Sequence, residues 1–174
     1  MQVSILAASD APRYRRLMLH GYEHAADAFT STAQERDAEP DSWWVRRIAD
    51  PEHMSVGFGA FSGEELVGAV SLEFSCKTKT KHKALVIGMY VLPAHRGRGA
   101  GRALLGAAID HAKSRSGTML LTLTVTQGNE AAIGLYRSLG FEVFGTEPMA
   151  IRTAAGFKAK LHMWRSIASE GAAA

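Results

Sequence analysis

The chain has 174 residues, the size of one domain with a hydrophobic core of its own. Its 47% hydrophobic and 21% charged residues are typical of a globular protein, and no apolar run reaches the roughly 18 residues of a membrane helix. The net charge of +3 raises nucleic-acid binding as a question, yet the basic residues gather at 77–83 and 96–102 without interleaved aromatic residues, which disfavours it.

The first fifty residues predict one short strand and two helices. In chain order these are a strand at 2–6, a helix from Asp10 to about Ala26 with Pro12 in its first turn, a polar loop at 30–39, and a helix that begins at 40–42. Trp43 and Trp44 on the second helix are expected in the helix core and in the wall of a cleft. We interpret residues 1–50 as a helical arm on the substrate side.

The rest of the chain alternates between strands and helices. The expected elements are strands at 56–61, 66–74 and 83–92, a helix from Gly101, a strand at 118–125, a helix from Asn129 that ends at Gly140, and strands at 141–145 and 158–165. This order predicts a single-domain α/β fold, a mixed sheet of about seven strands flanked by about four helices. Residues 51–165 form its core, and 168–174 are expected to be a flexible tail.

The segment 86–105 predicts a strand that runs through a glycine-rich turn into a helix. Three glycines alternate with other residues between Arg96 and Arg102, which exposes backbone N–H groups at a helix N-terminus and suits a diphosphate. A dinucleotide site would need a third glycine where Arg102 stands, soon after the first strand. A Walker A loop would need a Gly-Lys-Ser/Thr sequence, which does not follow. Both nucleotide motifs are therefore excluded.

The turn resembles motif A of the GNAT N-acetyltransferase family, whose pattern is Gln/Arg-x-x-Gly-x-Gly/Ala. Here it is Arg96-Gly97-Arg98-Gly99-Ala100-Gly101, preceded by Val91-Leu92-Pro93. The segment 129–141, NEAAIGLYRSLGF, is similar to the family's motif B. The resemblance covers 55–164 and implies a GNAT-like sheet that splays between its fourth and fifth strands, with acetyl-CoA as co-substrate.

The resemblance also implies the cofactor-binding residues. Backbone amides of the turn would hold the diphosphate, main-chain groups of the fourth strand would hold the pantetheine arm and the acetyl carbonyl, and an amide side chain in motif B would bind the cofactor or cap its own helix. These residues are Arg96, Gly97, Arg98, Gly99, Ala100, Gly101 and Arg102, then Met89, Tyr90 and Val91, and finally Asn129. The Val91 N–H is the expected donor to the oxyanion of the tetrahedral intermediate.

Tyr136 is the expected catalytic acid, since the family often places a tyrosine here to protonate the CoA thiolate; the alternative is an ordinary core aromatic. Thr124 stands where several relatives carry a glutamate base, so Glu73, His95 and ordered water remain open as the base. Cys76, the only cysteine, lacks a histidine–acid pair that would activate it as a nucleophile.

The sequence thus predicts an acetyl-CoA-dependent N-acetyltransferase that transfers acetyl directly to a primary amine, with no metal ion. A non-catalytic acyl-CoA-binding module and a nucleic-acid binder that uses 77–83 are the alternatives. The acceptor, a small molecule or a peptide or protein amine, stays open, and the loop at 30–39 and the connection at 147–157 are expected to select it.

Three further expectations concern the protein's surroundings. A single cysteine and the lack of a signal-peptide pattern at the N-terminus favour the cytoplasm and exclude an internal disulfide. Members of the family are often dimers, so a homodimer is expected. No membrane partner is expected.

Overall fold

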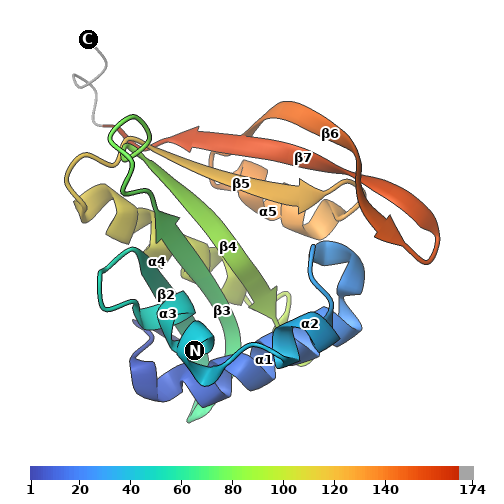
Figure 1. Ribbon diagram of the computed structural model, residues 1–174, viewed down its shortest axis with the longest axis horizontal. Helices are drawn as coiled ribbons and strands as arrows, with labels where there is room; N and C mark the ends of the chain where they lie inside the picture. Colours follow the sequence, from blue (N-terminus) through green and yellow to red (C-terminus); the bar gives the residue numbers. More distant parts are fainter. Residues whose placement is uncertain (169–174) are drawn as a thin grey trace.

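The computed structural model, which describes residues 1–168, is built on one mixed sheet of seven strands (Figure 1). The strands are β1 (Gln2–Ile5), β2 (Ser55–Ser62), β3 (Glu65–Phe74), β4 (Lys83–Val91), β5 (Leu120–Thr126), β6 (Glu142–Thr153) and β7 (Gly156–Ser166). Their order is β1-β2-β3-β4-β5-β7-β6, and every neighbouring pair is antiparallel except β4 and β5. The predicted α/β fold with a mixed sheet is confirmed. The tail expected at 168–174 lies outside the described residues except for Ala168.

Helices cover both faces of the sheet. They are α1 (Ala11–His24), α2 (Ala33–Asp37), α3 (Asp41–Ala49), α4 (Ala100–Ser114) and α5 (Glu130–Ser138), joined by short 3-10 turns. In Figure 1, α1, α2 and α3 lie in front of the sheet, and α4 and α5 lie behind it. The apolar side chains form two clusters accordingly, one built on α4, α5 and the central strands and the other on α1 and α3.

The short helix α2 corrects the expectation of a loop at 30–39. The Glu35 amide donates to the Thr32 hydroxyl at 3.2 Å, and the Thr32 amide donates to the Glu35 carboxylate at 2.8 Å. This reciprocal capping box satisfies two N–H groups that a short helix would otherwise leave free. Because the helix is only five residues long, its polar sequence carries no apolar period that would reveal it.

Strands β4 and β5 are paired only where they begin. The parallel ladder joins Lys83–Leu85 to Leu120–Thr122 and then stops, so the two strands diverge toward their C-terminal ends (Figure 1). On its other side β4 carries a bulge against β3, at which Gly88 has a φ of 61°. A bulge of this kind bends the strand and interrupts its ladder. The predicted splay is therefore confirmed.

The C-terminal hairpin is longer than expected. The sequence predicts strands at 141–145 and 158–165 with a long connection at 147–157, but β6 continues to Thr153 and a short turn through residues 154 and 155 joins it to β7. The ladder skips residues 148–150, between the pairs Glu147↔Lys160 and Ile151↔Lys158. Pro148 cannot donate to a ladder and sits in this bulge, which explains why it suggested a loop.

Candidate active site

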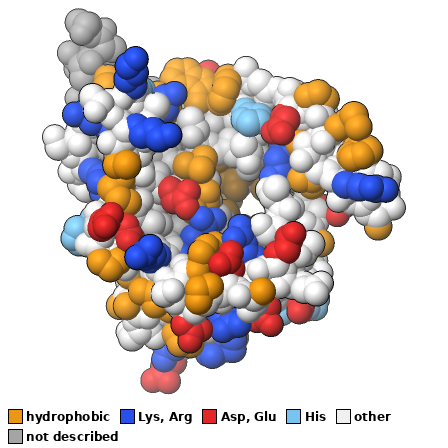
Figure 2. All heavy atoms as spheres, viewed as in Figure 1, with side chains coloured by type: hydrophobic (Ala, Val, Ile, Leu, Met, Phe, Trp, Pro, Cys, Tyr) orange, Lys and Arg blue, Asp and Glu red, His pale blue; other side chains and the backbone are white. Residues whose placement is uncertain are grey.

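The gap between β4 and β5 opens into a cavity of about 970 Å³. Figure 2 shows the molecule hollowed between the N-terminal helices and the C-terminal hairpin, with basic and acidic side chains at the margin. We call this the larger cavity, because a smaller one adjoins it. Eleven of the twelve site residues predicted from the sequence line the larger cavity, whereas Arg98 is exposed and does not. The eleven are Met89, Tyr90, Val91, Arg96, Gly97, Gly99, Ala100, Gly101, Arg102, Asn129 and Tyr136.

The glycine-rich turn presents bare backbone to the larger cavity. Gly97 and Gly99 have φ values of 71° and 84°, in the left-handed region that glycine adopts without strain, and no atom lies within 4 Å of a Cβ built on either. Gly99 is also the N-cap of α4. Free N–H groups and the positive end of the helix dipole therefore face the same space, which suits an anion such as a diphosphate.

The end of β4 turns polar backbone groups toward the gap. The Leu92 amide donates to the Val67 carbonyl at 2.9 Å, on the β3 side. Because peptide groups alternate along a strand, the N–H and C=O of Val91 point to the opposite side, where β5 has already diverged. The Arg96 Nε donates to the Val91 carbonyl at 2.9 Å. Among residues 1–168, no neighbouring strand accepts from the Val91 N–H, so this group is available to a ligand.

Asn129 caps α5 and lines the larger cavity. Its Oδ1 accepts from the Ala132 amide at 3.3 Å. The cap uses the side-chain oxygen, so the NH₂ group of the same amide can donate to a ligand. The two roles that the sequence left in competition are therefore compatible.

Tyr136 is 6% exposed and packs against Phe141, with ring centroids 6.1 Å apart. Burial raises the pKa of its phenol to about 12, because the low-dielectric surroundings disfavour the phenolate. The hydroxyl therefore keeps its proton at any physiological pH and can act only as a donor toward an anionic partner.

A smaller cavity of about 160 Å³ adjoins the larger one. The two share Ala28, Phe29, Met89, Thr124 and Tyr136 in their walls. The smaller cavity continues under α2 and α3 to basic and aromatic side chains from both halves of the chain. These are Tyr22, Arg36, Arg47 and Lys160. The two cavities thus meet at a shared wall that includes Tyr136, an arrangement that has room for one reactant on each side.

The candidate bases named from the sequence lie outside these cavities. Glu73 pairs with Arg47 and lines neither cavity, and neither does His95. Thr124 lines both but cannot act as a base at neutral pH. Within residues 1–168, no Asp or Glu lines the smaller cavity. Cys76 is exposed and away from both.

Sequence reasoning missed the segment that bridges the mouth of the gap, residues 25–29. The Thr126 hydroxyl donates to the Asp27 carbonyl at 2.7 Å, and the Lys158 ammonium pairs with the Asp27 carboxylate at 2.6 Å. These contacts join the chain just after α1 to β5 and β7, which are distant in the sequence. No motif marks them, because only the tertiary fold brings these residues together.

The described part of the chain contains no cluster of three or more His, Cys, Asp or Glu side chains placed to hold a metal ion. Among residues 1–168, no helix has both the length and the apolar character needed to cross a membrane.

Several curated proteins are similar to this chain in sequence. N-alpha-acetyltransferase RimI of Mycobacterium tuberculosis is 38% identical over 110 residues, 63% of this chain and 65% of that protein. Streptothricin acetyltransferase of Streptomyces lavendulae is 30% identical over 141 residues, 68% of this chain and 72% of that protein. The chain spans less than two-thirds of the length of several curated relatives. One of them is the uncharacterized protein ML0378 of Mycobacterium leprae, which is 52% identical over 56 residues, a match that covers 14% of that protein.

Solved structures share the fold over almost the whole chain. The yncA structure of Salmonella typhimurium, determined with its cofactor acetyl-CoA, superposes with a TM-score of 0.81 at 22% identity, covering 99% of this chain and 96% of that one. A GCN5-related N-acetyltransferase of Kribbella flavida gives 0.80 at 25% identity, covering 95% and 97%. The model of the acetyltransferase (GNAT) family matches residues 18–141. Together with the two motifs and the splayed sheet, this match shows that the chain belongs to the acetyltransferase (GNAT) family.

Proposed function

We propose that this protein is an acetyl-CoA-dependent N-acetyltransferase that transfers the acetyl group directly to a primary amine. The observation that carries the proposal is the meeting of two cavities at Tyr136, on the open side of the splay. The larger cavity has the anion-suited turn and room for a long cofactor. The smaller one has room for a small acceptor or for one end of a larger molecule.

The cofactor takes the larger cavity in this proposal. The amides of the turn 96–102 hold its diphosphate, and the Asn129 NH₂ group adds a hydrogen bond. Main-chain groups of Met89, Tyr90 and Val91 extend the interrupted sheet by pairing with the amides of the pantetheine arm. Free N–H groups at a helix N-terminus and unpaired strand edges are the features that support these roles.

The chemical step joins the two cavities. The neutral amine attacks the thioester carbonyl carbon, and the Val91 N–H stabilises the oxyanion that forms. The C–S bond then breaks, an amide forms, and the thiolate receives a hydrogen bond or a proton from Tyr136. The amine loses its extra proton to water, since no carboxylate lines the smaller cavity in residues 1–168 and Glu23 and Asp27 line only the larger one. Holding both reactants at one place lowers the entropic part of the barrier.

The proposal includes the wider setting that the sequence suggested. Residues 1–50 supply the wall on the acceptor side, consistent with the presence of α2 and α3 at the smaller cavity. The acceptor is a small-molecule or peptide amine; the relatives named above act on different amines, so their names leave it open. A cytoplasmic location remains a prediction from the sequence composition, and a homodimer remains a prediction from the family resemblance.

A turnover screen tests the proposed function. Thiol release from acetyl-CoA is followed over a panel of amino acids, polyamines, aminoglycosides and N-terminal peptides, with mass spectrometry of the acceptor. We expect thiol release that requires one class of amine and yields an equal amount of acetylated product. Tight acetyl-CoA binding without thiol release for any amine would contradict the proposal and indicate an acyl-CoA-binding module.

A further inference from the structure

Three basic side chains line the smaller cavity. Arg36 comes from α2, Arg47 from α3 and Lys160 from β7. Glu39 and Glu73 pair with the two arginines but do not line the cavity. The charged side chains that an acceptor meets are therefore all basic, although carboxylates outside the cavity pair with two of them, and this is an unexpected lining for a site that takes an amine.

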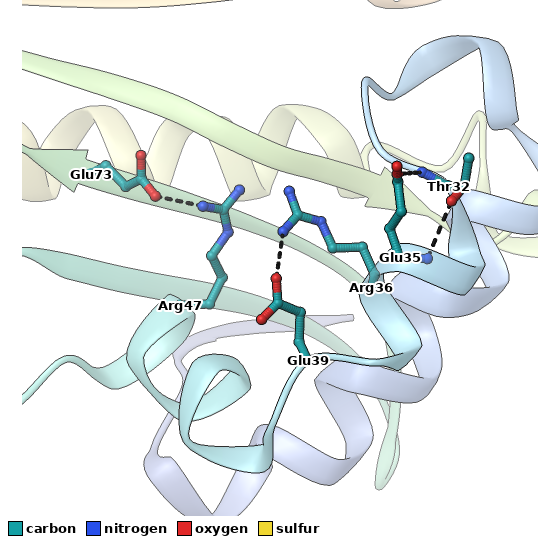
Figure 3. A network of polar contacts seen from close by, with 6 residues as sticks. All are labelled: Thr32, Glu35, Arg36, Glu39, Arg47 and Glu73. Carbon is teal, nitrogen blue, oxygen red and sulfur yellow. Dashed lines mark hydrogen bonds and ion pairs between the residues drawn. The ribbon is translucent and has the colours of Figure 1, made fainter.

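Trp43 and two carboxylates hold the arginine pair in place. The Cζ atoms of Arg36 and Arg47 lie 4.6 Å and 5.3 Å from the centroid of the Trp43 ring. Figure 3 shows Arg36 bound to Glu39 and Arg47 bound to Glu73, and both guanidinium groups line the smaller cavity. Stacking and pairing fix the planes of both groups before any ligand arrives.

The arginine pair has unused capacity for an anion. The Nε of Arg36 is buried and has no hydrogen-bond partner within residues 1–168, so a small movement of the side chain that turns this N–H toward a ligand costs no existing hydrogen bond. Each guanidinium carries five N–H donors and pairs with one carboxylate, and the hydroxyls of Tyr22 and Tyr14 interact with Arg36 and Arg47 respectively, which leaves further donors of each group for a ligand. Two positive groups that line one cavity repel, and an anion bound in that cavity offsets the repulsion and accepts from the donors that face it.

Lys160 adds a third positive charge at the same cavity. Its side chain is almost fully buried, and its Nζ donates to the Thr30 hydroxyl at 2.7 Å. Burial lowers the pKa of Lys160, while the Glu147 carboxylate opposes the shift. Nearby positive charges also lower the pKa of an acceptor ammonium, because they favour its neutral form. The basic wall thus helps to supply a neutral nucleophile where no carboxylate base lines the cavity within residues 1–168.

We propose that Arg36 and Arg47 bind the α-carboxylate of a free amino acid, whose amine is the acceptor; this rests on the proposed function. One carbon separates the two groups of an amino acid, so a carboxylate at the arginine pair keeps the amine inside the smaller cavity, which shares Met89, Thr124 and Tyr136 with the larger one. A peptide N-terminus has no carboxylate in that position. A polyamine would bring more positive charge to a positive wall.

The test compares the twenty free L-amino acids with their carboxamides and with short peptides, at saturating acetyl-CoA. Thiol release measures turnover, and ligand-observed NMR with unreactive CoA measures binding. The variants are Arg36→Gln and Arg47→Gln, with Arg36→Lys to keep the charge without the bidentate geometry. Arg46→Gln is the control, since Arg46 is exposed on α3 and lines neither cavity.

We expect the best amino acid to react roughly 10- to 100-fold faster, as kcat/KM, than its carboxamide. Arg36→Gln and Arg47→Gln should remove that preference by raising KM with little change in kcat, Arg36→Lys should retain part of it, and Arg46→Gln should keep it. The carboxamide serves as an internal control, because its turnover by the Gln variants shows that they are folded.

Other results separate this inference from the proposed function. Equal turnover of carboxamides or peptides, unchanged by Arg36→Gln, would overturn the carboxylate site and leave the acetyltransferase in place. Arginine-dependent binding of amino acids without any turnover would support the carboxylate site and contradict the proposed function. The absence of both turnover and binding of every amino acid would overturn the carboxylate site.

Discussion

Among single residues, Tyr136 is the one that we propose as the catalytic acid. It lies in the walls of both cavities, and its side chain is buried on an otherwise apolar stripe of α5. The sequence left open whether it is an acid or a core aromatic, since a tyrosine on such a stripe fits either role. Its position in the walls of both cavities is what only the fold could reveal.

Replacing Tyr136 by Phe tests the role of its hydroxyl. Phenylalanine fills the same space, and we expect kcat to fall about 100-fold, the scale of a lost general acid, with the acetyl-CoA dissociation constant unchanged. Steady-state kinetics and calorimetric titration measure the two quantities. A variant with normal kcat would show that Tyr136 is a packing residue.

The pH dependence of kcat gives an independent test. Burial raises the pKa of Tyr136 to about 12, so the phenol stays protonated and active as pH rises from 7 to well above the ordinary tyrosine value. We expect no loss of kcat with rising pH that is due to Tyr136 below about pH 10. A basic limb below that pH that disappears in Tyr136→Phe would contradict this.

At the scale of elements, the site depends on how β4 is bent and on how α2 is placed. The glycine-rich turn and the segment 129–141 are each formed by consecutive residues. For this reason the sequence predicted the turn at 96–102 and the start of α5 at Asn129 closely. A glycine inside a strand could have signalled the bulge at Gly88, and the Thr32–Glu35 spacing could have signalled α2. The meeting of Arg36, Arg47 and Lys160 had no such signal, since it depends on packing between three elements.

Gly88→Ala tests the bulge. Gly88 has a φ of 61°, and a Cβ built on it lies 3.1 Å from the Tyr14 hydroxyl. We expect the free energy of unfolding to fall by about 1–2 kcal/mol, the cost of the left-handed conformation for a residue with a Cβ. Urea denaturation measures the change.

Gly106→Ala is the matched control for Gly88→Ala. Gly106 lies inside α4, and a Cβ placed on it has no atom within 4 Å. Alanine should raise the free energy of unfolding by about 0.5–1 kcal/mol, since it restricts the unfolded chain and suits a helix. Equal effects of the two substitutions would show that the bulge carries no conformational constraint.

At the scale of the whole molecule, the splay divides the sheet into two parts that a ligand can join. Strands β1 to β4 meet β5 to β7 through three residue pairs of the β4–β5 ladder, with further contacts from Asp27 to Thr126 and Lys158. The resemblance of the two motifs to the family implied this division, whereas the order of elements indicated only a mixed sheet. The bridge through residues 25–29 was not predicted, since it joins positions that no local pattern connects.

Hydrogen exchange tests whether acetyl-CoA joins the two parts. The amides of Met89 to Val91 should exchange about 100-fold more slowly at a ligand concentration of roughly 100 times the dissociation constant, where their opening requires ligand release. Amides at the centre of β3, such as that of Leu72, are the control and should be protected in both states. Unchanged exchange at the end of β4 would place the cofactor elsewhere.

A crystal structure of this chain with acetyl-CoA would show whether the thioester lies on the open side of the splay, where we propose that it meets the amine. We expect the diphosphate against the amides of residues 96–102, the pantetheine arm along Met89–Val91, and the thioester sulfur beside the Tyr136 hydroxyl. The acetyl group should face the smaller cavity and its arginine pair. Acetyl-CoA bound away from the gap between β4 and β5, or with its acetyl group remote from Tyr136, would contradict the account.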